Sequence, residues 1–149
     1  MPFVHQLRVR YAEVDAQGVV FNAHWLTYAD DAATRFFEHA GFAPAELWGP
    51  DADPAWDVMV RRSELDFAGA AGFDELVDIA VTPTRVGTSS FDLTMTSSVA
   101  GRPAVTVTST YVTVLPGQLR SQPIPDGLRA ALATDLHPAT PTSRSATPA

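Results

Sequence analysis

Residues 10–25, RYAEVDAQGVVFNAHW, contain the side chain of this 149-residue chain that is best placed to do chemistry. Asp15 stands three residues before Gly18, in a segment whose other residues are largely apolar. A carboxylate held among apolar neighbours can act as a nucleophile or as a general base on water. An aspartate between two elements is also a common turn or helix-capping residue. Which of these roles Asp15 has depends on the elements that flank it and on where they place its side chain.

Composition and motifs exclude several other kinds of chemistry. The chain has no cysteine, and therefore no disulfide, thiolate nucleophile or thiolate ligand. Its histidines, at positions 5, 24, 39 and 137, lack the spacing of metal ligands, so no metal site is expected. There is no P-loop, GxGxxG, HExxH or GxSxG motif.

The bulk properties predict a single globular domain in the cytoplasm. The net charge of −7 disfavours nucleic acid and anionic membranes as partners, because both require a basic surface. No apolar run approaches the roughly 18–20 residues that cross a bilayer. The first ten residues, MPFVHQLRVR, lack the apolar stretch of a signal peptide. The absence of cysteine is also compatible with secretion.

A strand over residues 3–11 precedes Asp15, and a helix over about residues 23–40 follows it. The helix is predicted because apolar residues recur at positions i, i+3, i+4 and i+7 across four turns. Asn22 is a candidate N-cap and Gly41 a candidate C-terminal stop. The predicted apolar face comprises Trp25, Tyr28, Ala29, Ala32, Ala33, Phe36, Phe37 and Ala40.

The second half of the chain predicts strands with period-two alternation, joined by short turns that favour an antiparallel meander. The predicted strands are 58–67, 75–86, 89–99 and 103–115. Within the last of them the apolar phase changes between Val107 and Val112, which predicts a β-bulge near Ser109–Thr110 or burial on both faces. A short helix over 124–136 follows.

This order of elements predicts the fold class. One long apolar helix after the first strand, with four strands in series behind it, is an α+β arrangement and not the alternation of a parallel sheet. A curved antiparallel sheet of about five strands, wrapped around the central helix, would bury that helix on most of its circumference. The domain is predicted to span residues 1–136, and the Pro-, Ser- and Thr-rich residues 137–149 to form a disordered tail.

The same order, headed by the Asp15 segment, resembles the 4-hydroxybenzoyl-CoA thioesterase-like family of hotdog-fold proteins. The motif that carries the resemblance is Asp15, Gly18, Val19, Val20 and Phe21, followed by the aromatic Trp25. Weaker similarities, in GFDEL, VGTSS and PIPDGLRAAL, extend it to about residue 133. The resemblance implies a hotdog fold and an acyl-CoA thioesterase that hydrolyses its substrate to a free acid and coenzyme A without a cofactor. It also implies a homodimer or homotetramer.

The resemblance also implies roles for individual residues. Asp15 matches the catalytic carboxylate, as nucleophile or general base, and Asn22 matches the position whose backbone N–H faces the thioester carbonyl. Many members of the family carry histidine or tyrosine where this chain has Asn22. Gly18 allows the tight turn between them. The remaining matched positions are expected to bind substrate; they are Val19, Val20, Phe21, His24 and Trp25. Trp25 is equally well explained as a core residue.

Two other functions fit the same pattern. The protein could hydrolyse thioesters of an acyl carrier protein in lipid or polyketide metabolism, or it could be a non-catalytic hotdog module that binds acyl groups. Asp30 and Asp31 are the reserve carboxylates if Asp15 is inert. The candidate partners for coenzyme A phosphates are Arg61, Arg62, Arg85 and Arg102.

Overall fold

The computed structural model describes residues 2–138. The elements, in chain order, are β1 (Phe3–Arg8), the 3-10 turn η1 (Tyr11–Glu13), α1 (His24–His39), α2 (Pro44–Trp48), β2 (Asp57–Phe67), β3 (Leu76–Val86), β4 (Ser90–Val99), β5 (Arg102–Val114) and α3 (Asp126–Thr134). Of the predicted tail, residues 139–149 lie outside the described part of the chain. None of the helices within residues 2–138 has the length and apolarity to cross a bilayer.

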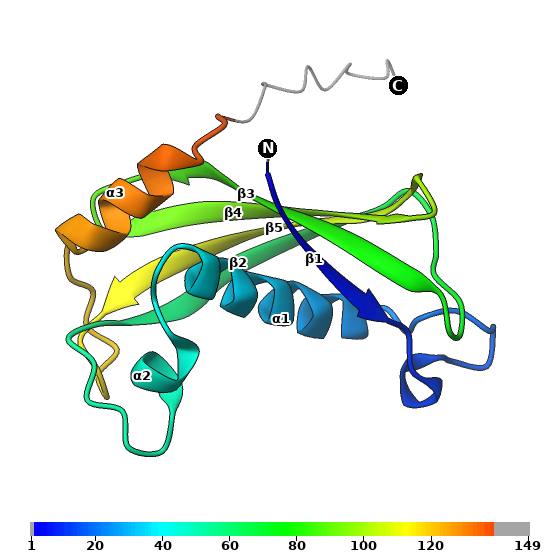
Figure 1. Ribbon diagram of the computed structural model, residues 1–149, viewed down its shortest axis with the longest axis horizontal. Coiled ribbons are helices and arrows are strands. Elements are labelled where there is room, and N and C mark those ends of the chain that lie inside the picture. Colours follow the sequence, from blue (N-terminus) through cyan, green and yellow to red (C-terminus); the bar gives the residue numbers. More distant parts are fainter. Residues whose placement is uncertain (1, 139–149) are drawn as a thin grey trace, which may run out of the picture.

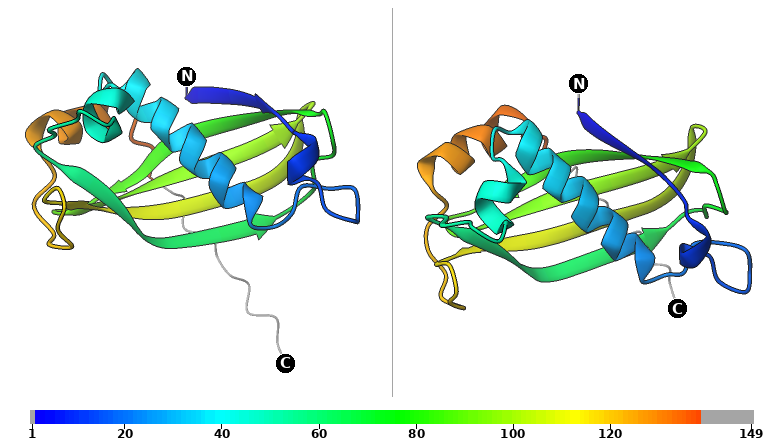
Figure 2. Two further views of the ribbon diagram at one scale, coloured as in Figure 1. Left: turned by 90° about the horizontal axis from the view of Figure 1, so that it is seen from below. Right: turned by 60° about the horizontal axis from the view of Figure 1, so that its bottom comes forward.

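The five strands form one antiparallel sheet in the order β1-β3-β4-β5-β2. Figure 1 shows this sheet arching over α1, and Figure 2 shows that the helix lies along its concave side with β1 and β2 at the two edges. The short helix α3 lies at the end of the sheet farthest from the start of α1. This arrangement confirms the predicted α+β fold, in which a long helix is wrapped by a five-stranded sheet.

The core forms between the apolar face of α1 and the concave face of the sheet. The helix buries the predicted residues from Trp25 to Phe37. The strands β3 and β4 alternate buried and half-exposed residues, as a sheet with one covered face must. The largest fully buried side chains include Phe36, Phe37, Phe91, Ile79, Leu93 and Met95. Each such side chain contributes about 1.5–3 kcal/mol by leaving water.

The two ends of α1 turned out differently from each other. At the C-terminus, Gly41 adopts φ +99°, and its N–H donates to Glu38 O at 3.0 Å while Phe42 N–H donates to Phe37 O at 2.9 Å. This is a Schellman cap, so the predicted stop at Gly41 is confirmed. The predicted N-cap is wrong, because the cap position is Ala23 and no side chain caps the helix. The exposed side chain of Asn22 leaves the first N–H groups of α1 uncovered.

The predicted bulge in the last strand was placed on the wrong strand. From Val105 to Thr113, β5 alternates buried and half-exposed residues without a slip, because Ser109 and Thr113 face inward where apolar residues were expected. At the end of the strand, Thr113 and Val114 are both buried. Ser63 contacts Ser109 by a side-chain hydrogen bond of 2.8 Å, which satisfies this inward hydroxyl. The irregularity nearest to Ser109–Thr110 lies opposite, in β2, where the register with β5 skips Arg61. A second irregularity lies near the start of β5, where the register with β4 shifts between Thr96 and Ser98.

Candidate functional site

Asp15 begins the turn of a tight hairpin between η1 and α1. Val14 pairs with Val20 as an antiparallel bridge, and Asp15 N–H donates to Val19 O at 2.9 Å. Gly18 N–H closes the turn on Asp15 O at 3.0 Å, and Gly18 takes φ +82°. A three-residue hairpin loop requires this left-handed position, which glycine adopts without strain. The spacing Asp15-x-x-Gly18 is therefore the spacing of this hairpin.

The carboxylate of Asp15 uses one of its two oxygens in the turn. Its Oδ1 accepts the Gln17 N–H at 2.8 Å, the side-chain contact of an Asx turn. Its Oδ2 accepts no hydrogen bond from any residue in the described part of the chain, and Asp15 is half-buried. Asp15 thus serves as a turn residue, one of the two roles considered from the sequence. This role uses only one carboxylate oxygen and leaves the other available to a ligand.

The hairpin is fastened to the connection between β2 and β3. Val20 N–H donates to Ala71 O at 2.9 Å, and Val19 pairs with Gly72. Gly72 N–H in turn donates to the Glu75 carboxylate at 2.7 Å. These contacts fix the position of the Asp15 turn relative to the sheet.

The same hairpin leads directly into the N-terminus of α1. Phe21 N–H donates to Glu13 O at 2.9 Å, and Phe21 O accepts the His24 N–H at 2.9 Å. Between these two residues, the N–H groups of Asn22 and Ala23 donate to no acceptor within residues 2–138. Free N–H groups at a helix start, together with the positive end of the helix dipole, favour a bound or developing negative charge.

The other predicted site residues divide into exposed and buried positions. Gly18 and Phe21 are exposed, and Val19 and His24 are half-buried. The rings of Phe21 and His24 meet edge to face at 6.0 Å, beside the free N–H groups. Val20 and Trp25 are each only 3% exposed, so both belong to the core that supports the hairpin and the helix start.

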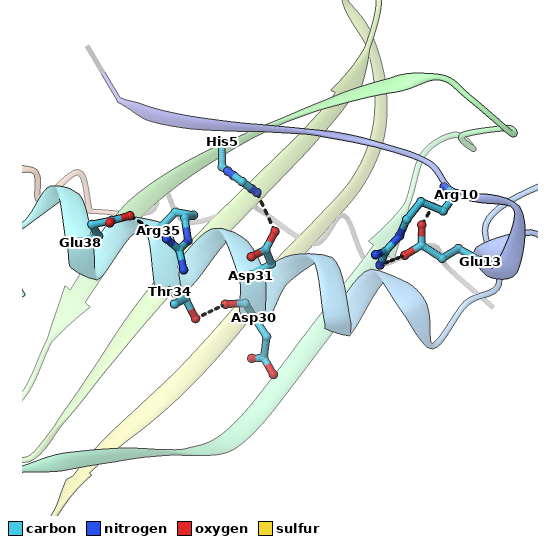
Figure 3. A network of polar contacts seen from close by, with 8 residues as sticks. All are labelled: His5, Arg10, Glu13, Asp30, Asp31, Thr34, Arg35 and Glu38. Carbon is cyan, nitrogen blue, oxygen red and sulfur yellow. Dashed lines mark hydrogen bonds and ion pairs between the residues drawn. The ribbon is translucent and has the colours of Figure 1, made fainter. Parts of the chain in front are cut away.

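A cleft of about 250 Å³ runs along α1 on the side of β2. It is lined by Asp30, Ala33, Thr34, Phe37, Trp48, Val58, Val60 and Tyr111. Figure 3 shows that Asp30 and Asp31 point to opposite sides of the helix, with Asp31 directed at His5, its partner at 2.7 Å. Of the two reserve carboxylates, only Asp30 therefore faces the cleft.

Asp30, Thr34 and Tyr111 place polar groups in the mostly apolar wall of this cleft. The Tyr111 hydroxyl is buried and has no hydrogen-bond partner in the described part of the chain. Burial, and then the nearby Asp30 charge, raise the pKa of Tyr111, so the hydroxyl keeps its proton. Burial also raises the pKa of Asp30 above its ordinary value. The inward direction of Tyr111 follows the alternation of β5, but its place beside Asp30 arises only from the fold.

Three of the four candidate phosphate-binding arginines lie together, and the fourth lies elsewhere. Arg61, Arg62 and Arg85 line a second cleft with Asp92 and Thr110, in which Arg85 is held by Asp92 at 2.9 Å. Arg102 instead pairs with Glu75 at 3.2 Å, and Glu75 also accepts the N–H of Gly72, the residue that pairs with Val19 of the Asp15 hairpin. Within residues 2–138 no three His, Asp or Glu side chains are grouped closely enough to hold a metal ion.

The comparison with known families identifies the whole domain. The thioesterase-like superfamily matches residues 9–132, which include the hairpin, α1 and the strands β2 to β5. The chain belongs to the thioesterase-like superfamily. The fold described above is accordingly the hotdog fold of that superfamily, and the protein is a thioester hydrolase.

Individual relatives agree with this assignment. The chain is 24% identical over 123 residues to a 1,4-dihydroxy-2-naphthoyl-CoA hydrolase of Synechococcus sp., covering 81% of this chain and 93% of that protein. An Aquifex aeolicus protein named as an esterase is 24% identical over 79 residues, which cover 53% of this chain and 59% of that protein. A thioesterase superfamily structure from Jannaschia sp. superposes with a TM-score of 0.84 and 25% identity, covering 93% of this chain and 94% of that one.

Proposed function

We propose that this thioesterase hydrolyses acyl-CoA thioesters with the Asp15 carboxylate and the free N–H groups at the start of α1. One observation carries the proposal: a single hairpin presents a carboxylate with an unoccupied oxygen and then runs into a helix start whose Asn22 and Ala23 N–H groups are unused. A nucleophile or base together with an oxyanion site is the minimum that acyl transfer needs.

Asp15 can act in this hydrolysis in either of two ways, as a nucleophile or as a general base. As a nucleophile, Asp15 adds to the thioester carbonyl, and the resulting oxyanion collapses to an acyl-aspartyl anhydride as coenzyme A leaves as a thiolate. Water then cleaves the anhydride to the free acid and the original carboxylate. As a general base, Asp15 removes a proton from the attacking water and returns it to the departing sulfur. Both forms place the oxyanion against the N–H of Asn22.

The cleft beside α1 is the natural place for the acyl group. Asp30 lies six residues beyond His24, which is about 9 Å along the helix from its start. That distance suits an aromatic acyl group whose carbonyl lies at the helix N-terminus. The Synechococcus relative is named for a dihydroxylated aromatic acyl group. We therefore propose a hydroxylated aromatic acyl group, with its hydroxyl hydrogen-bonded to Tyr111 and Asp30.

Tyr111→Phe tests this acyl site. The wild type should hydrolyse a hydroxybenzoyl-CoA faster than benzoyl-CoA, because the unsubstituted ring leaves the buried Tyr111 hydroxyl without a partner. The ratio of kcat/KM for hydroxybenzoyl-CoA to kcat/KM for benzoyl-CoA should be roughly tenfold smaller in the variant than in the wild type. This is the order expected for one lost hydrogen bond to a buried group. Tyr11→Phe, at a tyrosine that is 83% exposed, is the matched control and should leave the ratio unchanged. An unchanged ratio in folded Tyr111→Phe would place the acyl group elsewhere.

A hydrolysis screen tests the proposed function as a whole. The substrates are short, medium, long and aromatic acyl-CoAs, each compared with the same acyl group on an acyl carrier protein. We expect the protein to hydrolyse one or more acyl-CoAs faster than it hydrolyses the same acyl group on the carrier protein. Faster turnover on the carrier protein would favour the second function considered from the sequence. Tight binding of acyl-CoA without any turnover would favour the non-catalytic module.

We also propose that the active form is a homo-oligomer built by joining the β2 edges of two copies. The strand β2 is an 11-residue edge strand. Met59, Val60 and Phe67 are each exposed by 43–49% along it. An apolar edge with unpaired backbone groups tends to pair with another strand. A second copy of β2 would cover these side chains and would also border the cleft lined by Val60.

Sedimentation at micromolar concentration should therefore show a dimer or a tetramer. Val60→Glu places a charge in the proposed β2–β2 interface. It should shift the protein toward monomer and lower its activity. Val4→Glu is the matched control on the opposite edge, since Val4 is 51% exposed on β1. A wild type that sediments as an active monomer would contradict the proposal, as would dissociation by Val4→Glu alone.

A further inference from the structure

We infer that Glu13 and Tyr28 form a buried brace that holds the Asp15 hairpin and the N-terminus of α1 at their working separation. This inference rests on the proposed function, because it concerns the distance between the Asp15 carboxylate and the Asn22 N–H. Glu13 and Tyr28 touch neither substrate nor reacting atoms in that mechanism. Both are positioning residues.

Glu13 contacts the segment that leads into α1 through its backbone, and α1 itself through its side chain. Its carbonyl accepts the Phe21 N–H at 2.9 Å, at the residue just before the free N–H groups. Its carboxylate accepts the Tyr28 hydroxyl at 3.0 Å, from the second turn of α1. Glu13 also precedes Val14, which begins the paired part of the Asp15 hairpin. One residue thus connects the carboxylate-bearing turn with the residue that precedes the helix start and with the second turn of α1.

The remaining contacts keep the Glu13 carboxylate charged and immobile. Arg10 donates to it twice, through its backbone N–H at 2.8 Å and its guanidinium at 2.9 Å. Figure 3 shows these two bonds reaching the carboxylate beside the start of α1. Burial by itself would raise the pKa of Glu13, but the hydrogen bonds from Arg10 and Tyr28 outweigh it and lower that pKa. Glu13 is therefore ionised at neutral pH and accepts from three donors at once.

The burial of the Glu13 carboxylate sets it apart from the acidic partners in the other ion pairs among residues 2–138, although the Arg10 side chain is itself exposed. The Glu13 side chain is 6% exposed, whereas that of Glu38 in the equivalent i,i+3 pair with Arg35 is 54% exposed. Tyr28 is 3% exposed and packs edge to face on Trp25 with ring centres 5.4 Å apart. A buried charge-assisted bond holds its geometry more strictly than an exposed one, because water does not compete for it.

Such a brace should act on the rate of the chemical step. The oxyanion forms only in the transition state, so a shift of the hairpin relative to the helix weakens a contact that the bound substrate does not yet make. A misplacement of about 1 Å can cost on the order of 10²-fold in rate. Loss of the brace should lower kcat and leave KM nearly unchanged.

The test is a double-mutant cycle on Glu13→Leu, which keeps the side-chain volume and removes the acceptor, and Tyr28→Phe, with hydrolysis of a hydroxybenzoyl-CoA as the readout. We expect Tyr28→Phe to lower kcat by roughly tenfold, with KM within about twofold of the wild type. The double variant should lose no more than the worse single variant, because both changes remove one shared hydrogen bond. Amide exchange at Phe21 should accelerate in both variants, since Phe21 N–H depends on Glu13 O.

Two controls distinguish positioning from general destabilisation. Glu38→Gln breaks the exposed i,i+3 pair, and Tyr11→Phe removes an exposed hydroxyl; both should leave kcat unchanged. Folded Tyr28→Phe with wild-type kcat would overturn the inference, and so would losses in the cycle that simply add. A wild type without thioesterase activity, or full activity in Asp15→Asn, would instead overturn the proposed function on which the inference rests.

Discussion

Asp15→Asn should fold, should still bind acyl-CoA, and should lose at least about 10²-fold in kcat, the usual scale for a positioned acid or base. Asparagine keeps the size of the side chain, and its amide oxygen can still accept the Gln17 N–H that Asp15 Oδ1 accepts at 2.8 Å. The turn should therefore survive. What disappears is the negative charge and the basicity, which both forms of the proposed mechanism require. Steady-state kinetics with a hydroxybenzoyl-CoA, together with a binding titration, measure the two effects separately.

A second aspartate in a turn provides the control. Asp51 is exposed in the turn ahead of β2, and Asp51→Asn should leave kcat and KM at their wild-type values. Loss of folding in Asp15→Asn would mean that the residue serves the turn alone. Undiminished hydrolysis by the folded variant would remove Asp15 from the mechanism. In that event Asp30 becomes the carboxylate to test, because it faces the cleft while Asp31 is bound to His5.

Patterns that repeat along the chain predicted the framework of the domain. The apolar period of α1 extends over four turns, and the structure places its ends within one residue of the prediction. The strands β3, β4 and β5 follow from period-two alternation and short turns, and they pair as the predicted meander. Gly41 was identifiable because a helix often ends on a residue with positive φ, which glycine adopts most easily.

Features that depend on a single contact were missed or misplaced. Asn22 has a side chain that favours the N-cap position. Phe21, just before it, donates its N–H to Glu13 O, and the N-cap is Ala23, one residue after the predicted position. The bulge lies in β2 because register depends on both strands, and alternation within β5 reports on only one of them.

The candidate site was predictable only where its residues are consecutive. The Asp15 hairpin and the helix start lie in one segment, so their proximity follows from the sequence. Glu13 and Tyr28 are 15 positions apart, and no periodicity relates them. The cleft joins Asp30 on α1 to Tyr111 on β5, which meet only after the sheet has wrapped around the helix. Nothing local in either segment indicates such a pair.

Asn22→Pro is the sharpest test of the oxyanion site, because it deletes a backbone N–H and leaves the helix intact. The bond from His24 N–H to Phe21 O makes residues 21–24 a turn in which Asn22 holds the second position. Proline is favoured there and at helix starts, where its missing N–H has no intrahelical acceptor to lose. Phe21 follows the paired Val20 and donates to Glu13 O, which fits the extended backbone that a following proline requires.

The expected result is a loss of about 10²–10³-fold in kcat, the range measured when one donor of an oxyanion site is removed. Asn22→Ala is the matched control, because it removes the exposed side chain and keeps the N–H. It should retain kcat within a few-fold, and circular dichroism should show unchanged helix content in both variants. Equal losses in the two variants would assign the role to the Asn22 side chain. Wild-type kcat in folded Asn22→Pro would leave the Ala23 N–H as the remaining donor, because the helix start has no other unused N–H group among residues 2–138.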